Sequence, residues 1–118
     1  MGVKSYKHLD VWNKGIEIVD RIYQITRDFP SEERYVLTAQ MQRAAISIPS
    51  NIAEGFNRYH NKEYRQLLYT ALGSSAELET QLEVSCDLGY SEHGMSERLL
   101  EMLDHESRML RNLIKKLS

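Results

Sequence analysis

The residues with the most definite chemistry lie between Thr38 and Arg58, where the polar side chains are short and are spaced to share one side of a helix. At about 100° per residue, six of them fall together on that side, and Ser50 lies at its margin. They are Gln40, Arg43, Ser47, Asn51, Glu54 and Arg58. Hydroxyl and amide groups make hydrogen bonds of definite geometry, whereas an ordinary solvent-facing helix carries interchangeable lysines and glutamates. The face is therefore either a polar surface that happens to have short side chains, or a surface that meets another subunit or a ligand.

The usual metal ligands are present but form no pattern that binds a metal. The four histidines are scattered, and none belongs to the Glu-x-x-His pair of di-iron bundles or to a His-Glu-x-x-His motif. The single cysteine, Cys86, cannot supply a zinc site built on cysteine pairs, and we expect it to be a core residue rather than a nucleophile. No glycine-rich loop that could bind phosphate follows a strand-like segment. The sequence therefore predicts no metal and no other cofactor.

Two carboxylates are expected to be semi-buried, namely Glu54 and Glu77. Each of them could pair with an arginine such as Arg43 or Arg58. A small hydrolase would need clustered carboxylates or a metal inside the protein, and the sequence shows neither pattern. We therefore expect that this protein is not an enzyme.

Helices must position these residues, because apolar residues recur at helical spacing along nearly the whole chain. This pattern, with stop signals at Phe29-Pro30 and Gly89, predicts four helices in a single domain of residues 1–118. The helices are expected at about residues 10–28, 38–56, 61–88 and 92–117, with Asp10, Asn61 and Ser91 as their N-terminal caps. Long helices with short connections favour an all-α, antiparallel up-down-up-down four-helix bundle.

The first two helices are each expected to bury one apolar stripe. In the first helix the predicted stripe consists of Trp12, Ile16, Val19, Ile22, Tyr23 and Thr26. In the second helix it consists of Met41, Ala45, Ile48 and Ile52. Pro49 interrupts the hydrogen bonding of the second helix, and we expect a kink rather than a break because the stripe keeps its phase across it.

The third helix carries an additional stripe of mostly small residues behind its apolar side. Its members are Tyr69, Gly73, Ala76, Thr80 and Val84, called the small-residue stripe below. Glycine inside a helix costs about 1 kcal/mol relative to alanine, so Gly73 suggests that another backbone packs closely against it. That partner could belong to the same chain or to another subunit. The alternative is a shallow, exposed face.

Charge is uneven along the predicted bundle, although the net charge is only −2. The topology gathers acidic residues at one end, namely Asp28, Glu32, Glu33, Glu83, Asp87, Glu92 and Glu97. It gathers cations at the other end, namely Lys4, Lys7, Lys14, Arg58, Lys62, Arg65, Arg111, Lys115 and Lys116. A basic end can attract phosphates, but cations also suit helix C-termini and solvated tails. Charge alone leaves both interpretations open.

The sequence favours a cytoplasmic protein that does not contact a membrane. A single cysteine excludes an intramolecular disulfide and fits a reducing compartment. No apolar run approaches the ~20 residues of a membrane span. The first residues, MGVKSYKHLD, lack the apolar segment of a secretory signal.

One segment carries a specific family resemblance. Residues 40–55, QMQRAAISIPSNIAEG, closely resemble the signature of the four helix bundle proteins encoded in 23S ribosomal RNA intervening sequences. Further matches extend over nearly the whole chain: Leu9-x-Val11-Trp12, Tyr23-x-x-Thr26-x-x-Phe29-Pro30, Glu63-Tyr64, Gly73-Ser74-x-x-Glu77-Leu78-x-Thr80-Gln81 and Leu88-Gly89-Tyr90. This family is similar in fold to the accessory variability proteins of diversity-generating retroelements. The resemblance implies an antiparallel four-helix bundle that assembles into a homopentameric ring and has a role with nucleic acid.

A ring would give the surplus surfaces of the bundle a use, because each subunit needs two contact surfaces. We expect one surface to lie at a subunit junction or to line a central channel, and its residues are Gln40, Arg43, Ser47, Asn51, Glu54, Arg58 and Glu77. The candidate nucleic-acid contacts are Arg58, Lys62, Arg65, Lys115 and Lys116. The partner would be RNA or a nucleic-acid enzyme. The alternative is a protein-interaction scaffold that contacts no nucleic acid.

Overall fold

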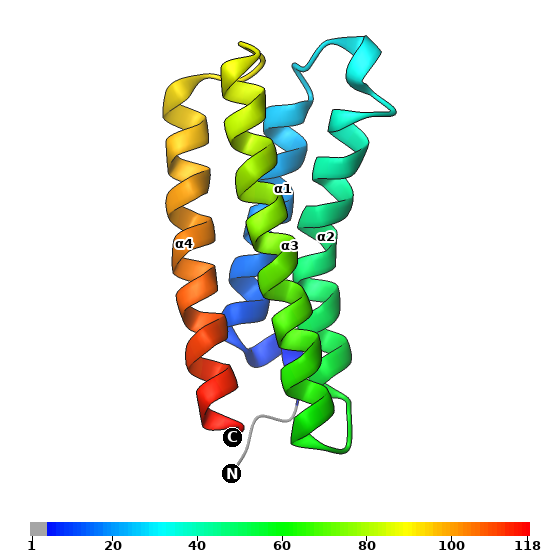
Figure 1. Ribbon diagram of the computed structural model, residues 1–118, viewed down its shortest axis with the longest axis vertical. Helices are drawn as coiled ribbons and strands as arrows, with labels where there is room; N and C mark the ends of the chain where they lie inside the picture. Colours follow the sequence, from blue (N-terminus) through cyan, green and yellow to red (C-terminus); the bar gives the residue numbers. More distant parts are fainter. Residues whose placement is uncertain (1–4) are drawn as a thin grey trace.

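The computed structural model describes residues 5–118 and shows four α-helices with two short 3-10 turns. The turns are η1, Tyr6–His8, and η2, Ser31–Glu33. The helices are α1, Asp10–Thr26; α2, Leu37–Phe56; α3, Asn61–Asp87; and α4, His93–Lys116. Figure 1 shows that successive helices run in opposite directions, with the start of α1 and the end of α4 at the lower end of the bundle. The predicted all-α four-helix bundle is thus confirmed, and the described residues contain no strand.

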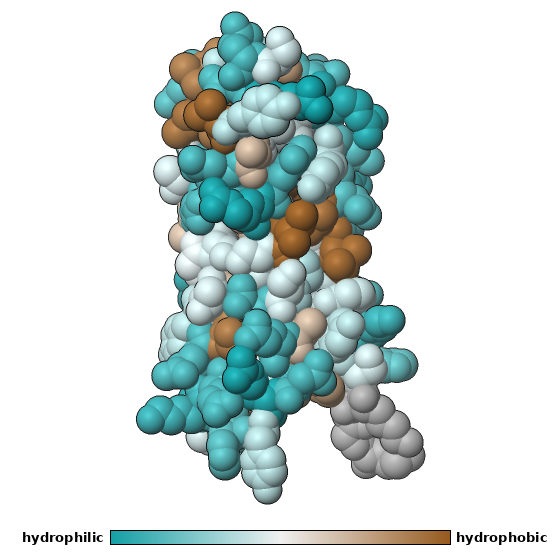
Figure 2. Space-filling view, turned by 90° about the vertical axis from the view of Figure 1, so that its right-hand side faces the viewer, coloured by the Kyte–Doolittle hydropathy of each residue, from teal (hydrophilic) through white to brown (hydrophobic). Residues whose placement is uncertain are grey.

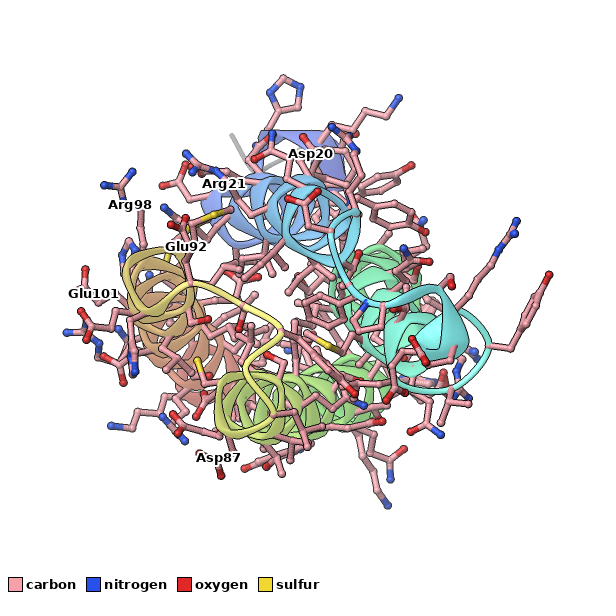
Figure 3. All side chains as sticks on the ribbon, turned by 90° about the horizontal axis from the view of Figure 1, so that it is seen from above. Asp20, Arg21, Asp87, Glu92, Arg98 and Glu101 are labelled. Carbon is pink, nitrogen blue, oxygen red and sulfur yellow. The ribbon has the colours of Figure 1, made fainter. Side chains whose placement is uncertain are left out.

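The helices pack around one core in the cyclic order α1, α2, α3, α4, so that α1 contacts α2 and α4 while α3 contacts the same two helices. The view from above in Figure 3 shows the four helices around a shared interior into which side chains point. Burial of apolar surface stabilises this arrangement, at roughly 1.5–3 kcal/mol for each large side chain that is removed from water. The largest fully buried apolar side chains are Ile18, Ile22, Met41, Ile48, Ile52, Leu68, Leu78, Leu82, Leu103 and Leu110.

The predicted stripe of α1 is displaced by about one residue. The helix buries Val11, Gly15, Ile18, Ile22, Ile25 and Thr26. Ile22 and Thr26 were predicted correctly, whereas Tyr23 and Ile16 are exposed and Trp12 and Val19 are only partly buried. The reason is Gly15, which faces the interior and leaves room for a side chain from α4. Glycine has no apolar side chain, so the spacing of large apolar residues does not reveal Gly15 as a core position.

α2 follows its prediction closely. Met41, Ala45, Ile48 and Ile52 are all fully buried, and the helix runs without a break through Pro49. The Pro49 ring is itself buried and lies against the position of Gly15 on α1. Core packing therefore compensates for the backbone hydrogen bond that the proline removes.

The predicted caps are wrong, because Asp10 and Asn61 are the first residues of their helices rather than the capping residues. Ser91 lies one residue before the observed cap of α4, and its hydroxyl bonds to those of Ser85 and Ser96 instead. The end of α3 does match its prediction. Gly89 has a φ of 77°, and the amide of Tyr90 donates to the carbonyl of Ser85 at 2.9 Å, which is the bond that closes a Schellman motif.

None of the helices in residues 5–118 is both long enough and apolar enough to span a membrane.

Candidate functional site

The predicted polar face of α2 lies beside α3, and hydroxyl groups join the two helices. The hydroxyl oxygens of Ser47 and Ser74 are 2.7 Å apart. The Asn51 side chain donates to the carbonyl and the hydroxyl of Ser47, at 2.8 and 2.9 Å. Arg43, Ser47, Ser74 and Glu77 line a surface hollow of about 200 Å³, called the polar hollow below. The structure thus brings Arg43, Ser47, Asn51 and Glu77 together.

Ser74 was missed as a site residue, although it lies one helical turn before Glu77. The spacing of three residues could have identified Ser74, because it places Ser74 and Glu77 on the same face of the third helix. What the sequence could not show is that this face would meet Ser47. That contact depends on how α2 and α3 pack.

The remaining residues of the predicted face are separate from the polar hollow. Gln40, Glu54 and Arg58 are exposed. Arg58 donates to Glu54 at 2.5 Å and lies 3.7 Å from Glu63. The hydrogen bond to Glu54 raises the pKa of the Arg58 guanidinium. Glu54, Arg58 and Glu63 therefore form an ion-pair cluster at the end of α2, and Gln40 lies apart at the start of that helix.

The prediction that Glu54 and Glu77 are semi-buried is wrong, because both are exposed. Among residues 5–118, the buried carboxylate is instead Glu106 on α4, which has no exposed surface. Neither of its carboxyl oxygens has a hydrogen-bond partner among residues 5–118. Burial raises the pKa of Glu106 from 4.5 to about 8, and the charge of Lys14 counteracts this in part. A carboxyl group enclosed in this way cannot reach a substrate, so it does not form a catalytic site in this conformation.

Glu106 could have been found from spacing alone. It occupies a position in the series Leu99, Leu103, Glu106, Leu110 and Ile114, whose members are all buried on α4. An acidic residue in an apolar stripe indicates either a wrong helical phase or a buried charge.

The predicted nucleic-acid residues lie at one end of the bundle, but they differ in availability. The Arg65 guanidinium donates to the Leu117 carbonyl and so ties the start of α3 to the end of α4. Arg58 is already paired with two carboxylates. Lys62, Lys115 and Lys116 are exposed, and no described residue forms an ion pair with them. These three lysines are called the lysine cluster below.

The opposite end of the bundle is acidic, as expected. Figure 3 looks onto this end and labels Asp87 and Glu92 there. Both side chains are exposed, as are Asp28, Glu32 and Glu97. Lys4, which was predicted to belong to the basic end, lies outside the described residues.

An apolar groove between α1 and α2 was not anticipated. Figure 2 views the molecule from the α2 side and shows a brown, hydrophobic patch near mid-height. The groove holds about 280 Å³ and is lined by Tyr6, Trp12, Ile16, Val19, Ile46, Pro49, Ser50 and Ala53. Ile16 and Ile46 are 36% and 43% exposed. The side chains that the sequence had assigned to the core of the first helix therefore line a surface groove.

The small-residue stripe of α3 is exposed along its whole length, from Tyr69 to Val84. A Cβ atom added at Gly73 would meet nothing within 4 Å in residues 5–118. The predicted close packing is therefore absent within residues 5–118, and in the single chain the stripe is the shallow, exposed face that was the alternative.

Sequence and structure comparisons identify the group of proteins to which this bundle is related. Residues 7–112 match the family of 23S rRNA-intervening sequence proteins. The chain belongs to this family. No curated protein matches it. A similar fold is found in the 1.70 Å crystal structure of a protein of unknown function from the S23 ribosomal protein family of Bacteroides thetaiotaomicron VPI-5482. That protein is 24% identical, the match covers 89% of this chain and 95% of the other, and the TM-score is 0.82.

In this 23S rRNA-intervening sequence protein, the matched region contains most of the features described above. It includes the polar hollow, the α1–α2 groove apart from Tyr6, the small-residue stripe and Glu106. Lys115 and Lys116 lie beyond its last residue. Within residues 5–118, no three His, Cys, Asp or Glu side chains are grouped in a way that could hold a metal ion.

Proposed function

We propose that this 23S rRNA-intervening sequence protein is a non-enzymatic, cytoplasmic bundle that associates with copies of itself and contacts RNA with its basic end. Association is supported by one observation above all, the apolar groove between α1 and α2 that residues 5–118 leave uncovered. Contiguous exposed apolar surface on a small protein usually marks an interaction site. The resemblance described above adds the expectation of a homopentameric ring.

Two different surfaces lie on either side of α2, as a ring requires. One is the α1–α2 groove with Ile16 and Ile46. The other is the polar hollow, with the small-residue stripe next to it on α3. A ring uses head-to-tail contacts, in which one surface of each subunit meets a different surface of the next. In this arrangement Ser47, Asn51 and Glu77 lie at the junction, where their polar groups fix its geometry.

Variants of the two surfaces are expected to complement one another. Ile46→Lys places a charge in the groove, and Ala76→Arg places a long side chain on the small-residue stripe. Both positions are exposed, so neither change disturbs the core. We expect light scattering to show an oligomer for the wild type, single chains for each variant, and a heterodimer for their mixture, because one intact contact remains in the mixed pair.

Tyr35→Lys is the matched control, since Tyr35 is 82% exposed and belongs to neither surface. It is expected to leave the oligomer intact. A wild-type protein that is monomeric at all concentrations would refute self-association. Loss of the oligomer in the control would show that added charge, rather than the position of the variant, is responsible.

RNA contact is proposed for the lysine cluster of Lys62, Lys115 and Lys116, because these cations are exposed and free of carboxylate partners among the described residues. Each cation that neutralises a phosphate contributes about 0.7–0.9 to the slope of binding against salt concentration on logarithmic axes. Replacing all three with alanine is expected to lower this slope by about 2 for a fluorescein-labelled RNA hairpin, measured by anisotropy.

The control removes the same charge from the opposite end, by replacing Arg27, Arg34 and Arg98 with alanine. All three are exposed. This variant is expected to retain the wild-type slope. Equal losses in both variants would indicate a response to net charge only. An absence of binding by the wild type would favour the alternative, a protein-interaction scaffold, with which the net charge of −2 and the neutralised Arg58 are consistent.

A further inference from the structure

Glu106 occupies a central position at which three helices meet. It belongs to the buried side of α4 and is fully enclosed. A Cβ atom added at Gly15 of α1 would lie 3.2 Å from its Oε2 atom and 3.4 Å from the ring of Pro49 on α2. The carboxyl group therefore fits into space that the missing side chain of Gly15 leaves open.

The surroundings offer this carboxyl group little compensation. Neither oxygen accepts a hydrogen bond from a described residue. The polar group next to it, Ser107, is hydrogen-bonded to Ser75 of α3 at 3.1 Å. Pro49, the neighbour from α2, carries no charge. An isolated ionised carboxylate is strongly disfavoured in such a site, so Glu106 needs either its proton or a cation.

Lys14 of α1 directly precedes Gly15, and its charge partly offsets the rise in the pKa of Glu106 that burial causes. Its ammonium group now lies 3.5 Å from Glu17, and its side chain is 25% exposed, which places it at the boundary between solvent and core. The charged neighbours on α4 are not available, because Asp104 and Arg108 pair with each other at 3.2 Å and are exposed, and His105 is exposed as well.

We propose that Lys14 changes partner according to the state of Glu106. When Glu106 carries a proton, Lys14 pairs with Glu17 at the surface. When Glu106 releases that proton to solvent, the Lys14 ammonium turns inward and pairs with the Glu106 carboxylate, and Glu17 is left to water. A lysine is suited to this role because its charge lies at the end of a flexible four-carbon chain. The seam between α1 and α4 thereby becomes a proton-sensitive element of the bundle.

The experiment follows the side-chain carboxyl carbons by NMR in protein labelled with ¹³C-glutamate, over a pH titration. The signal of Glu106 is assigned by its loss in Glu106→Gln, and that of Glu17 by its loss in Glu17→Gln. In the wild type, we expect the Glu17 signal to show a second inflection at the midpoint of Glu106, because Glu17 loses its partner at that point. In Lys14→Met, this inflection should disappear and Glu106 should bind its proton about tenfold more tightly.

Glu101→Gln is the control, since Glu101 is an exposed carboxylate on the same helix. It is expected to leave both inflections in place. An inflection of Glu17 that persists in Lys14→Met would reflect direct repulsion between the carboxylates and would overturn the exchange. So would a wild-type Glu17 signal without a second inflection, or a Glu106 midpoint that is the same with and without Lys14.

Discussion

The contribution of Glu106 to the free energy of unfolding is expected to fall by about 4 kcal/mol as the pH rises from 4.5 to about 8, and Glu106→Gln is expected to abolish this fall. In the folded state, burial raises the pKa of Glu106 to about 8, whereas in the unfolded chain the group has its ordinary value of 4.5. Between these values the unfolded chain has released the proton and the folded protein has kept it. Rising pH therefore favours the unfolded state over this window, and the full contribution of the protonated Glu106 to stability is present only below pH 4.5.

Urea unfolding at a series of pH values would measure this effect. Gln has nearly the shape of a protonated Glu, so Glu106→Gln should match the wild type at acid pH and exceed its stability at pH 8. The control is Glu101→Gln, which removes an exposed carboxylate from the same helix and should retain the wild-type dependence on pH. If Glu106→Gln lost stability with pH as steeply as the wild type, the dependence would come from other groups.

The core positions of Gly15 and Glu106 were not predicted from the sequence. The helices themselves were predictable, because apolar residues recur along each of them and the end of α3 carries a strong glycine signal. Gly15 and Glu106 escaped notice because each looks unsuited to a core when taken alone. The two residues fit the core only together, because the missing side chain of Gly15 leaves the space that the Glu106 carboxyl group occupies. Such a pairing depends on which helices are neighbours. The same limit applies to Ser47 and Ser74, whose contact joins two helices.

The neighbours of a helical glycine likewise decide whether its missing side chain allows close packing. Gly55 and Gly73 both lie within helices, and crowding was predicted at Gly73. The structure places it at Gly55 instead. A Cβ atom there would lie 2.8 Å from the Tyr64 ring and 3.3 Å from Leu67, whereas Gly73 is open. Tyr64 has little freedom to move, because it is buried and its ring packs edge-on against Phe56.

Opposite effects on stability are therefore expected from the same substitution at these two glycines. Gly55→Ala should lower the free energy of unfolding by about 1–3 kcal/mol, because the new methyl group forces Tyr64 or the backbone of α2 to shift. Gly73→Ala should raise it by up to about 1 kcal/mol, because alanine is the better helix former and nothing opposes it within the chain. Urea unfolding of single chains, at concentrations too low for association, measures both values.

Each variant serves as the control for the other, since both make the same chemical change inside a helix. Equal effects at the two sites would mean that helix propensity alone decides, and the proposed close approach of α2 to Tyr64 would be wrong. Gly73→Ala also bears on self-association, because a neighbouring subunit that packs closely on the small-residue stripe would meet the added methyl group. In that case Gly73→Ala should be more stable than the wild type as a single chain and yet form a weaker oligomer. A small-residue stripe that contacts no neighbouring subunit would not produce this combination.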